Sequence, residues 1–264
     1  MAAVVVTGPA FPRIPNLRDI GGRRTADGRR VVANRLYRAG SLQDASDDDR
    51  SALVALGVRT VIDLRSEWER RRDPDELPGA RVVPAPLVDD AVVAAITARF
   101  AAGTLPSAEL EDWWNLTRVF QAPEEHVVSM RVIFAALLDS APDHAVLFHC
   151  RGGKDRTGLV AALVLEALGV TREETLADFV AGNSALKDER MAEHLAPIIR
   201  TAAHPLTEAA LFSLAGVKAE WLHTLFTGIE ERFGSVERYL ADHVGIGEHG
   251  LRQLRAMYLE TDRG

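Results

Sequence analysis

The sequence predicts an α/β fold in which helices flank a central, mostly parallel sheet. Short apolar runs at residues 58–65, 80–88 and 145–150 have the length and composition of buried strands. Helical patterns lie between these runs. With 264 residues, of which 47% are hydrophobic and 26% charged, the chain can bury a core of ordinary composition. We therefore expect residues 1–264 to form a single domain.

The first part of the chain favours short strands and turns, because it contains paired glycines and an Asp-Gly turn signal. A serine followed by three aspartates then predicts a helix over 46–57, with a terminal glycine. The β-branched run 58–65 predicts a buried strand that ends near Asp63.

A charged segment and a further strand follow. Residues 66–73 predict one or two turns of solvated helix, which Pro74 ends. The run 80–88 predicts a strand whose later half lies at a sheet edge, because Pro84 and Pro86 cannot donate to a neighbouring strand.

The second half of the chain is predicted to be mainly helical around one strand. Residues 89–140 favour helices, with breaks near Gly103 and at Pro123, and residues 145–150 favour a short strand. Trp113 and Trp114 lie in an amphipathic pattern that suits either a lid or the core. Further helical patterns occupy residues 157–170, 171–183, 184–200, 207–214 and 218–233, followed by short helices to the end.

Charge and cysteine content exclude several classes of protein. The formal charge of −7 argues against a nucleic-acid binder. A single cysteine provides neither an internal disulfide nor a four-cysteine zinc site, and we expect no metal and no cofactor. The start of the chain has no basic segment typical of a signal peptide, and no run approaches the ~18 apolar residues of a membrane span. We therefore expect a cytoplasmic protein, with export by an unconventional route left open.

The only cysteine, Cys150, lies in "FHCRGGKDRTG" at residues 148–158, between a predicted strand and a predicted buried helix. A helix N-terminus beyond the carboxyl end of a strand offers free backbone N–H groups and a positive dipole end. Glycines let such amides turn inward, and arginine can bind two oxygens with its planar guanidinium. The segment is therefore a candidate site for a tetrahedral anion such as phosphate, formed by Arg151, Gly152, Gly153, Lys154, Asp155 and Arg156.

The same positive field stabilises a thiolate, so we expect Cys150 to be a nucleophile that attacks phosphorus. Thr157 could then donate its hydroxyl to the sulfur and ease its departure. An isolated cysteine at a strand end is more often core, but core packing does not require two glycines, a lysine, an aspartate and an arginine in the following loop. A nucleotide-binding loop is excluded, because Asp155 follows Lys154 where serine or threonine is needed.

The pattern His149-Cys150, five residues, then Arg156-Thr157 resembles the signature of the cysteine-dependent protein tyrosine phosphatases. The fuller "HCRGGKDRTG" resembles the loop of the bacterial tyrosine/serine protein phosphatases of the PtpB type. The segments "NLRDIGG" (16–22), "LYRAGSL" (36–42), "VIDLRSEWE" (61–69) and 164–183 resemble further blocks of that family, in order.

This resemblance implies a protein tyrosine phosphatase-like fold and hydrolysis of phosphotyrosine. It also implies phosphoserine, phosphothreonine or phosphoinositides as further substrates, and a small phosphate ester stays open as the substrate. A helical lid is expected within 89–123 or 184–218.

The leaving oxygen needs a proton, and two aspartates could supply it. We favour Asp155, because an aspartate in the loop resembles the myotubularin-type phosphatases, over Asp63 at the end of a neighbouring strand. Asp63 could instead orient Arg65 or Arg156, and Asp155 could instead position Arg156. Lys154 suits a polyanionic head group, although it could equally tune the thiolate.

Other charged residues are expected to support the loop rather than to react. His149 is expected to form a hydrogen bond behind the loop, and Arg18, Asp19 and Arg38 are expected to buttress it by ion pairs. Two other functions stay open at this point: a rhodanese-type sulfurtransferase and a catalytically weak phosphate-binding module. An arsenate reductase would need further cysteines, which the chain does not have.

Overall fold

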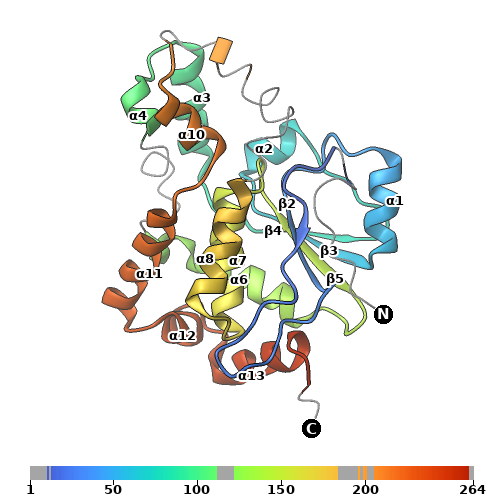
Figure 1. Ribbon diagram of the computed structural model, residues 1–264. Coiled ribbons are helices and arrows are strands. Elements are labelled where there is room, and N and C mark those ends of the chain that lie inside the picture. Colours follow the sequence, from blue (N-terminus) through green and yellow to red (C-terminus); the bar gives the residue numbers. More distant parts are fainter. Residues whose placement is uncertain are drawn as a thin grey trace.

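Five strands form the central sheet of the computed structural model, in the order β1-β2-β5-β3-β4 (Figure 1). The structure describes residues 11, 13–111, 122–183, 196, 199–200 and 205–261. β2, β5, β3 and β4 are parallel, and β1 pairs with β2 in the antiparallel direction. The α/β class with a mostly parallel sheet is therefore confirmed, and β4 lies at an edge as its prolines predicted. The strands are β1 (Arg18–Asp19), β2 (Leu36–Ala39), β3 (Val58–Asp63), β4 (Arg81–Pro84) and β5 (Ala145–His149).

The sheet divides the hydrophobic core into two clusters, because successive side chains of a strand point to opposite faces. Ile62 and Phe148 belong to the larger cluster, under the helices of the second half of the chain. Val61 and Leu147 belong to the smaller cluster, under α1 (Asp47–Ala55). The larger cluster is built with α6 (Val127–Leu138), α7 (Asp155–Ala167), α8 (Arg172–Ala181), α11 (Ala219–Phe233), α12 (Val236–Arg238), the π-helical η4 (Tyr239–Val244) and α13 (Gly247–Tyr258).

Helix boundaries follow the local capping signals. Ser46 caps α1 in a capping box, and the hydroxyl of Thr171 accepts from the amide of Glu174 at the start of α8. α7 begins at Asp155, two residues before the predicted start, because the amide of Gly158 already donates to the carbonyl of Lys154. Trp113, Trp114 and most of the helix predicted over 184–200 lie outside the described residues.

Two helical segments that are far apart in sequence lie side by side at the upper left of Figure 1. The hydroxyl of Ser107 in α4 accepts a hydrogen bond from the amide of Thr207, which caps α10. The Thr207 hydroxyl lies 2.6 Å from a carboxylate oxygen of Glu111. The remaining helices are α2 (Glu67–Arg72), α3 (Asp90–Ala101), α4 (Ser107–Glu111), the 3₁₀-helix η2 (Pro123–His126) and α10 (Glu208–Ala215).

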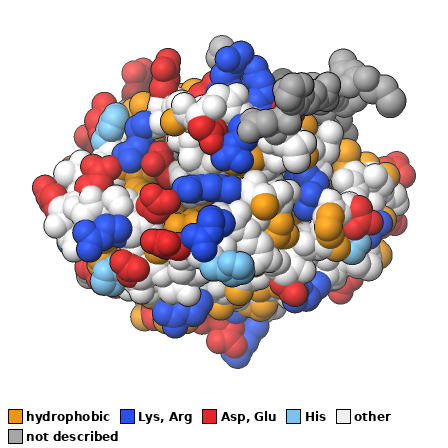
Figure 2. Space-filling model, turned by 90° about the horizontal axis from the view of Figure 1, so that it is seen from below, with side chains coloured by type: hydrophobic (Ala, Val, Ile, Leu, Met, Phe, Trp, Pro, Cys, Tyr) orange, Lys and Arg blue, Asp and Glu red, His pale blue; other side chains and the backbone are white. Residues whose placement is uncertain are grey.

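The surface carries charges of both signs. On the face shown in Figure 2, acidic and basic side chains are interspersed rather than gathered into areas of one sign. Pairs such as Arg172–Glu230 and Arg255–Glu237, both with nitrogen and oxygen 3.0 Å apart, show how such charges neutralise each other. Among the described residues, no helix combines the length and the apolar character that crossing a membrane requires.

Candidate active site

The loop that joins β5 to α7 lies at the carboxyl ends of the parallel strands. Cys150 directly follows β5, and α7 begins at Asp155, so the loop runs from the end of a strand to the N-terminus of a helix. The thiol is free and only 3% of Cys150 is exposed. Cys150 therefore lies between the end of β5 and the N-terminus of α7.

The orientation of the loop is fixed by its carbonyl oxygens, all of which contact groups behind it. The contacts are His149 Nδ1 to Cys150 O (3.1 Å), Ser41 N to Arg151 O (2.9 Å), Asn16 Nδ2 to Gly152 O (2.8 Å), and Arg38 Nη2 to Gly153 O (3.0 Å) and Lys154 O (3.3 Å). The peptide bonds are trans, so each following N–H points away from its carbonyl. The amides of residues 151–155 therefore face the opposite side, where an anion would lie.

Gly153 is the loop residue that the backbone requires to be glycine. Its φ is +71°, a region that side chains other than glycine's rarely adopt. A Cβ there would lie 2.5 Å from the nitrogen of Gly40 and 2.6 Å from the carbonyl carbon of Ala39. The loop therefore packs directly on the chain that leaves β2.

A buried ion cluster holds Arg38 in place. Arg38 Nη1 lies 2.6 Å from Asp178, which also pairs with Arg23 and Arg18. Burial alone would raise the pKa of Asp178, but the charges of Arg38, Arg18 and Arg23 lower it well below its usual range. Burial and the charge of Arg38 lower the pKa of Arg18 to about 10. Of the three residues predicted to buttress the loop, Arg38 contacts it directly and Arg18 acts through Asp178. Asp19 instead accepts from the amides of Gly21 and Asn34.

The guanidinium of Arg156 is bound in a bidentate manner by Glu69, at 2.6 and 3.0 Å. Burial would raise the pKa of Glu69, but the charge of Arg156 outweighs it and lowers that pKa to about 2. Although burial alone would lower the pKa of Arg156, the charges of Glu69 and Cys150 raise it. Arg156 is therefore a fixed cation near the sulfur.

Sequence reasoning missed Glu69, because residues 66–73 were predicted to form a solvated helix. That prediction holds for Arg71, whose side chain is 77% exposed, but Glu69 is only 5% exposed. The available signal was the spacing of Ser66 and Glu69, which form a capping box at the start of α2. This box explains the glutamate locally, so no sequence pattern indicated that Glu69 has a second partner.

Lys154 and Asp155 form a pair at the rim of the loop. The ammonium of Lys154 lies 2.7 Å from Asp155 Oδ2. It also donates to the carbonyls of Ser213 and Gly216, at the end of α10. Only 8% of Lys154 is exposed, and its charge is therefore used within the protein rather than offered to solvent.

Asp63 lies away from this rim, and its carboxylate is bound by Arg65. Its carboxylate accepts from the Arg65 side chain at 2.8 to 3.2 Å and from the Arg65 amide at 3.0 Å. Burial would raise the pKa of Asp63, yet Arg65 and His149 lower it. The Arg65 guanidinium also reaches the hydroxyl of Ser41, whose amide holds the loop. Arg156 is oriented by Glu69 rather than by Asp63 or Asp155.

Thr157 was predicted to donate to the sulfur, but its hydroxyl instead lies 3.4 Å from the carbonyl of Ala39. Arg151, at the other end of the loop, pairs with Asp73 at 3.1 Å and is about one third exposed. The loop therefore has buried groups behind it and a cationic side chain at its opening.

A loop of inward-facing amides, a buried thiol and a clamped arginine define a cysteine-dependent phosphatase. The chain belongs to the tyrosine phosphatase family, whose model matches residues 9–260. The resemblance found in the sequence is thereby confirmed, and the chain is a phosphatase of this class.

Two curated relatives match most of the chain. A protein of Cupriavidus necator described as a tyrosine-protein phosphatase is 33% identical over 95% of this chain and 88% of its own. The triple specificity protein phosphatase PtpB of Mycobacterium tuberculosis is 31% identical over 94% of this chain and 98% of its own. Among solved structures, TpbA of P. aeruginosa overlaps 80% of this chain and 94% of its own, at 18% identity and a TM-score of 0.37.

Proposed function

We propose that the chain hydrolyses phosphate monoesters through a phosphocysteine formed on Cys150. The observation that carries this proposal is the set of carbonyl contacts behind residues 150–154, because they direct five successive amides toward one side. Those amides and the clamped Arg156 would bind the three non-bridging oxygens of the phosphoryl group.

In the first step the thiolate of Cys150 forms a bond to phosphorus while the bond to the ester oxygen breaks. The leaving oxygen takes the proton of the Asp155 carboxyl group. In the second step a water molecule gives a proton to the Asp155 carboxylate and its oxygen bonds to phosphorus. The sulfur then leaves with its electron pair, which restores the enzyme and releases inorganic phosphate.

Asp155 is the better candidate for the acid because of where its carboxyl group lies. It begins α7 at the rim of the loop, and its side chain is 15% exposed. Asp63 is 2% exposed and both of its carboxylate oxygens accept from the Arg65 side chain, so neither oxygen is available to a substrate. We assign Asp63 to the positioning of Arg65.

We further propose that α3, α4 and α10 form the lid, within the ranges 89–123 and 184–218 expected from the sequence. The support is the contact of Lys154 with two carbonyls at the end of α10, which brings this helix to the rim of the loop. The hydrogen bonds between Ser107 and Thr207 join α4 to the same unit.

The proposed substrate is a phosphorylated protein, with phosphotyrosine as the preferred ester. The family description supports this choice. The polyanionic alternative, a phosphoinositide, drew its support in the sequence from Lys154, and that cation is now bound by Asp155 and two carbonyls. Rates on phosphotyrosine, phosphoserine, phosphothreonine and phosphoinositide substrates distinguish these options.

The test is hydrolysis of para-nitrophenyl phosphate in the presence of a metal chelator. We expect turnover by the wild type, loss of turnover in Cys150→Ser with inorganic phosphate still bound, and a phosphorylated cysteine after rapid acid quench. Asp155→Asn should lower kcat by about 10² to 10⁴, the range typical of a lost general acid. A rate equal to wild type in Asp155→Asn would refute the acid assignment, and phosphate binding without any turnover by the wild type would favour a binding module.

A further inference from the structure

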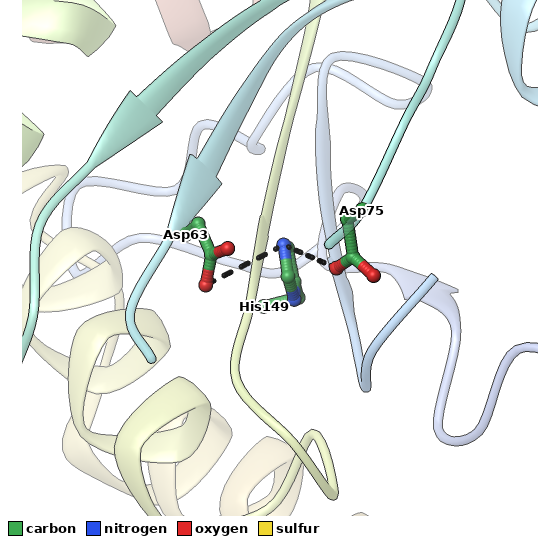
Figure 3. A group of neighbouring side chains, drawn as sticks. All are labelled: Asp63, Asp75 and His149. Carbon is green, nitrogen blue, oxygen red and sulfur yellow. Dashed lines mark ion pairs between the residues drawn. The ribbon is translucent and has the colours of Figure 1, made fainter. Parts of the chain in front are cut away.

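Three buried side chains meet behind the loop, from three different segments (Figure 3). Asp63 ends β3, His149 ends β5, and Asp75 lies between α2 and β4. Their side chains are 2%, 0% and 2% exposed. The proposed mechanism assigns no role to Asp75.

The contacts of His149 define where its ring carries hydrogen. Nδ1 lies 3.1 Å from the carbonyl oxygen of Cys150. A carbonyl oxygen can only accept, so Nδ1 carries a proton. Nε2 lies 3.3 Å from Asp75 Oδ2 and 3.9 Å from Asp63 Oδ1.

Nε2 makes no aligned hydrogen bond with any described residue, although it is fully buried. A ring protonated only on Nδ1 would direct the lone pair of Nε2 at two carboxylates, which is repulsive away from water. A second proton at Nε2 makes both of these contacts attractive.

The other charges of the cluster lead to the same conclusion. The guanidinium of Arg65 lies 2.8 Å from Asp63 and 3.0 Å from Asp75, so two buried carboxylates share one arginine. One further proton makes the group of four side chains neutral. Asp63, Asp75 and His149 are residue types that bind metal ions. However, the guanidinium of Arg65 already forms ion pairs with both carboxylates.

Asp75 also reaches the loop by a second route. Its carboxylate lies 3.2 Å from the amide of Leu42 and 3.2 Å from the hydroxyl of Ser41. Ser41 holds the carbonyl of Arg151, and His149 holds the carbonyl of Cys150. Asp75 therefore stands behind the first two peptide units of the loop.

We propose that Asp75 and His149 retain one shared proton behind the nucleophile, and that Asp75 is thereby a positioning residue for Cys150. This inference rests on the proposed function only where activity is the readout. The amide of Leu42 and Arg65 both donate to the same Asp75 oxygen, so the proton resides on the imidazole. When the pair loses this proton at alkaline pH, Nε2 repels both carboxylates and the peptide after Cys150 loses its fixed orientation.

The first experiment records the charge state of His149 by two-bond ¹H–¹⁵N spectra of wild-type protein between pH 6 and 9. We expect both ring nitrogens to be protonated at pH 7. A neutral ring at pH 7 overturns the proposal, whether or not the protein is an active phosphatase and whether or not any variant folds.

The second experiment compares Asp75→Asn and Asp75→Glu with Asp44→Asn, an exposed carboxylate near the same segment. The substrate is an aryl phosphate whose leaving oxygen needs no proton, so that Asp155 does not determine the alkaline limb of kcat/KM. In Asp75→Asn the pH of this limb should fall by about one unit or more, because the counter-charge of His149 is removed. Asp75→Glu should restore much of the wild-type profile, and Asp44→Asn should keep it. An unshifted limb in a folded Asp75→Asn, with turnover retained, refutes this inference and leaves the proposed function standing. Absence of turnover in the wild type refutes the proposed function, and the spectra still test the pair.

Discussion

The floor of the site and its roof, which is the proposed lid of α3, α4 and α10, are built in different ways. On the floor, the carbonyls of residues 150–154 and the guanidinium of Arg156 are held by buried partners from distant parts of the chain. At the roof, α4 and α10 are joined by surface hydrogen bonds between Ser107 and Thr207 and by one buried hydroxyl, that of Ser213, which donates to the carbonyl of Glu111. Polar contacts are worth more where water is excluded than at the surface.

This difference matches the demands of the proposed reaction. Charge builds up on the phosphoryl oxygens, and donors that already point at them need no reorganisation during the step. The roof must admit a substrate and release phosphate, which requires contacts that open at low cost. Variants of the floor should therefore affect catalysis strongly, and variants of the roof should affect local opening.

Among variants that keep every reacting side chain, the largest effect is expected for Gly153→Ala. The new Cβ would lie within 3 Å of the backbone of Ala39 and Gly40, in a conformation with positive φ. We expect kcat/KM to fall by about 10² to 10³, the loss typical of a displaced oxyanion donor. The free energy of unfolding, measured with denaturant, should fall by about 2 to 4 kcal/mol.

Gly152→Ala is the matched control for stability. Its new Cβ would meet only the side chain of Lys154, at 3.9 Å. If both variants lower the free energy of unfolding equally, the close approach of Gly153 to β2 is not the cause of the lost stability.

A middle effect is expected for Glu69→Gln, which removes the counter-charge of Arg156. The fold should survive with a lower free energy of unfolding, and kcat/KM should fall by about 10-fold to 10²-fold because the guanidinium is no longer held in register. Steady-state rates and denaturant unfolding measure the two effects.

The free energy of unfolding should also depend on pH through the pair of Glu69 and Arg156. Glu69 has a pKa of about 2 in the folded protein, below its ordinary value of 4.5, so the unfolded chain binds the proton more tightly. The pair therefore contributes its full stabilisation, up to about 3 kcal/mol, above pH 4.5, and loses it as the pH falls toward 2. Glu69→Gln should flatten this acid loss, whereas Glu67→Gln, on the exposed side of α2, should leave it unchanged. An acid profile of Glu69→Gln that matches the wild type contradicts the assignment.

The sequence could predict features of the site that lie within one short segment, but not contacts between distant segments. Cys150 and Arg156 lie within one short segment that joins β5 to the first turn of α7, so their chemistry could be inferred from spacing and from the physics of a helix N-terminus. Glu69 lies 87 residues from Arg156, and its local role as a capping residue already accounts for it. Such a contact depends on how β3 and β5 are paired, which local patterns do not specify.

The groups that bind the loop carbonyls could not be predicted from the sequence either. The amide of Ser41 and the side chain of Asn16 hold loop carbonyls, yet neither residue type carries a signal for this role. Lys154 was interpreted through its charge alone, and the structure shows the ammonium directed to the carbonyls of Ser213 and Gly216. Sequence patterns therefore predicted which residues could react, and tertiary structure determined which partners orient them.

The smallest effect on catalysis is expected for Thr207→Ala at the roof. This change removes the cap of α10, because the threonine hydroxyl accepts from the amide of Ala210, and it removes the contact with Glu111. Loss of such a cap costs about 1 kcal/mol locally, and kcat/KM should stay within about three-fold of wild type. Amide hydrogen exchange should accelerate in α10 and stay unchanged in α7. Thr224→Ala, which removes only a hydroxyl bonded to the carbonyl of Glu220 within α11, is the control. If exchange in α7 accelerates together with that in α10, the roof and the floor open as one unit, and the distinction between them does not hold.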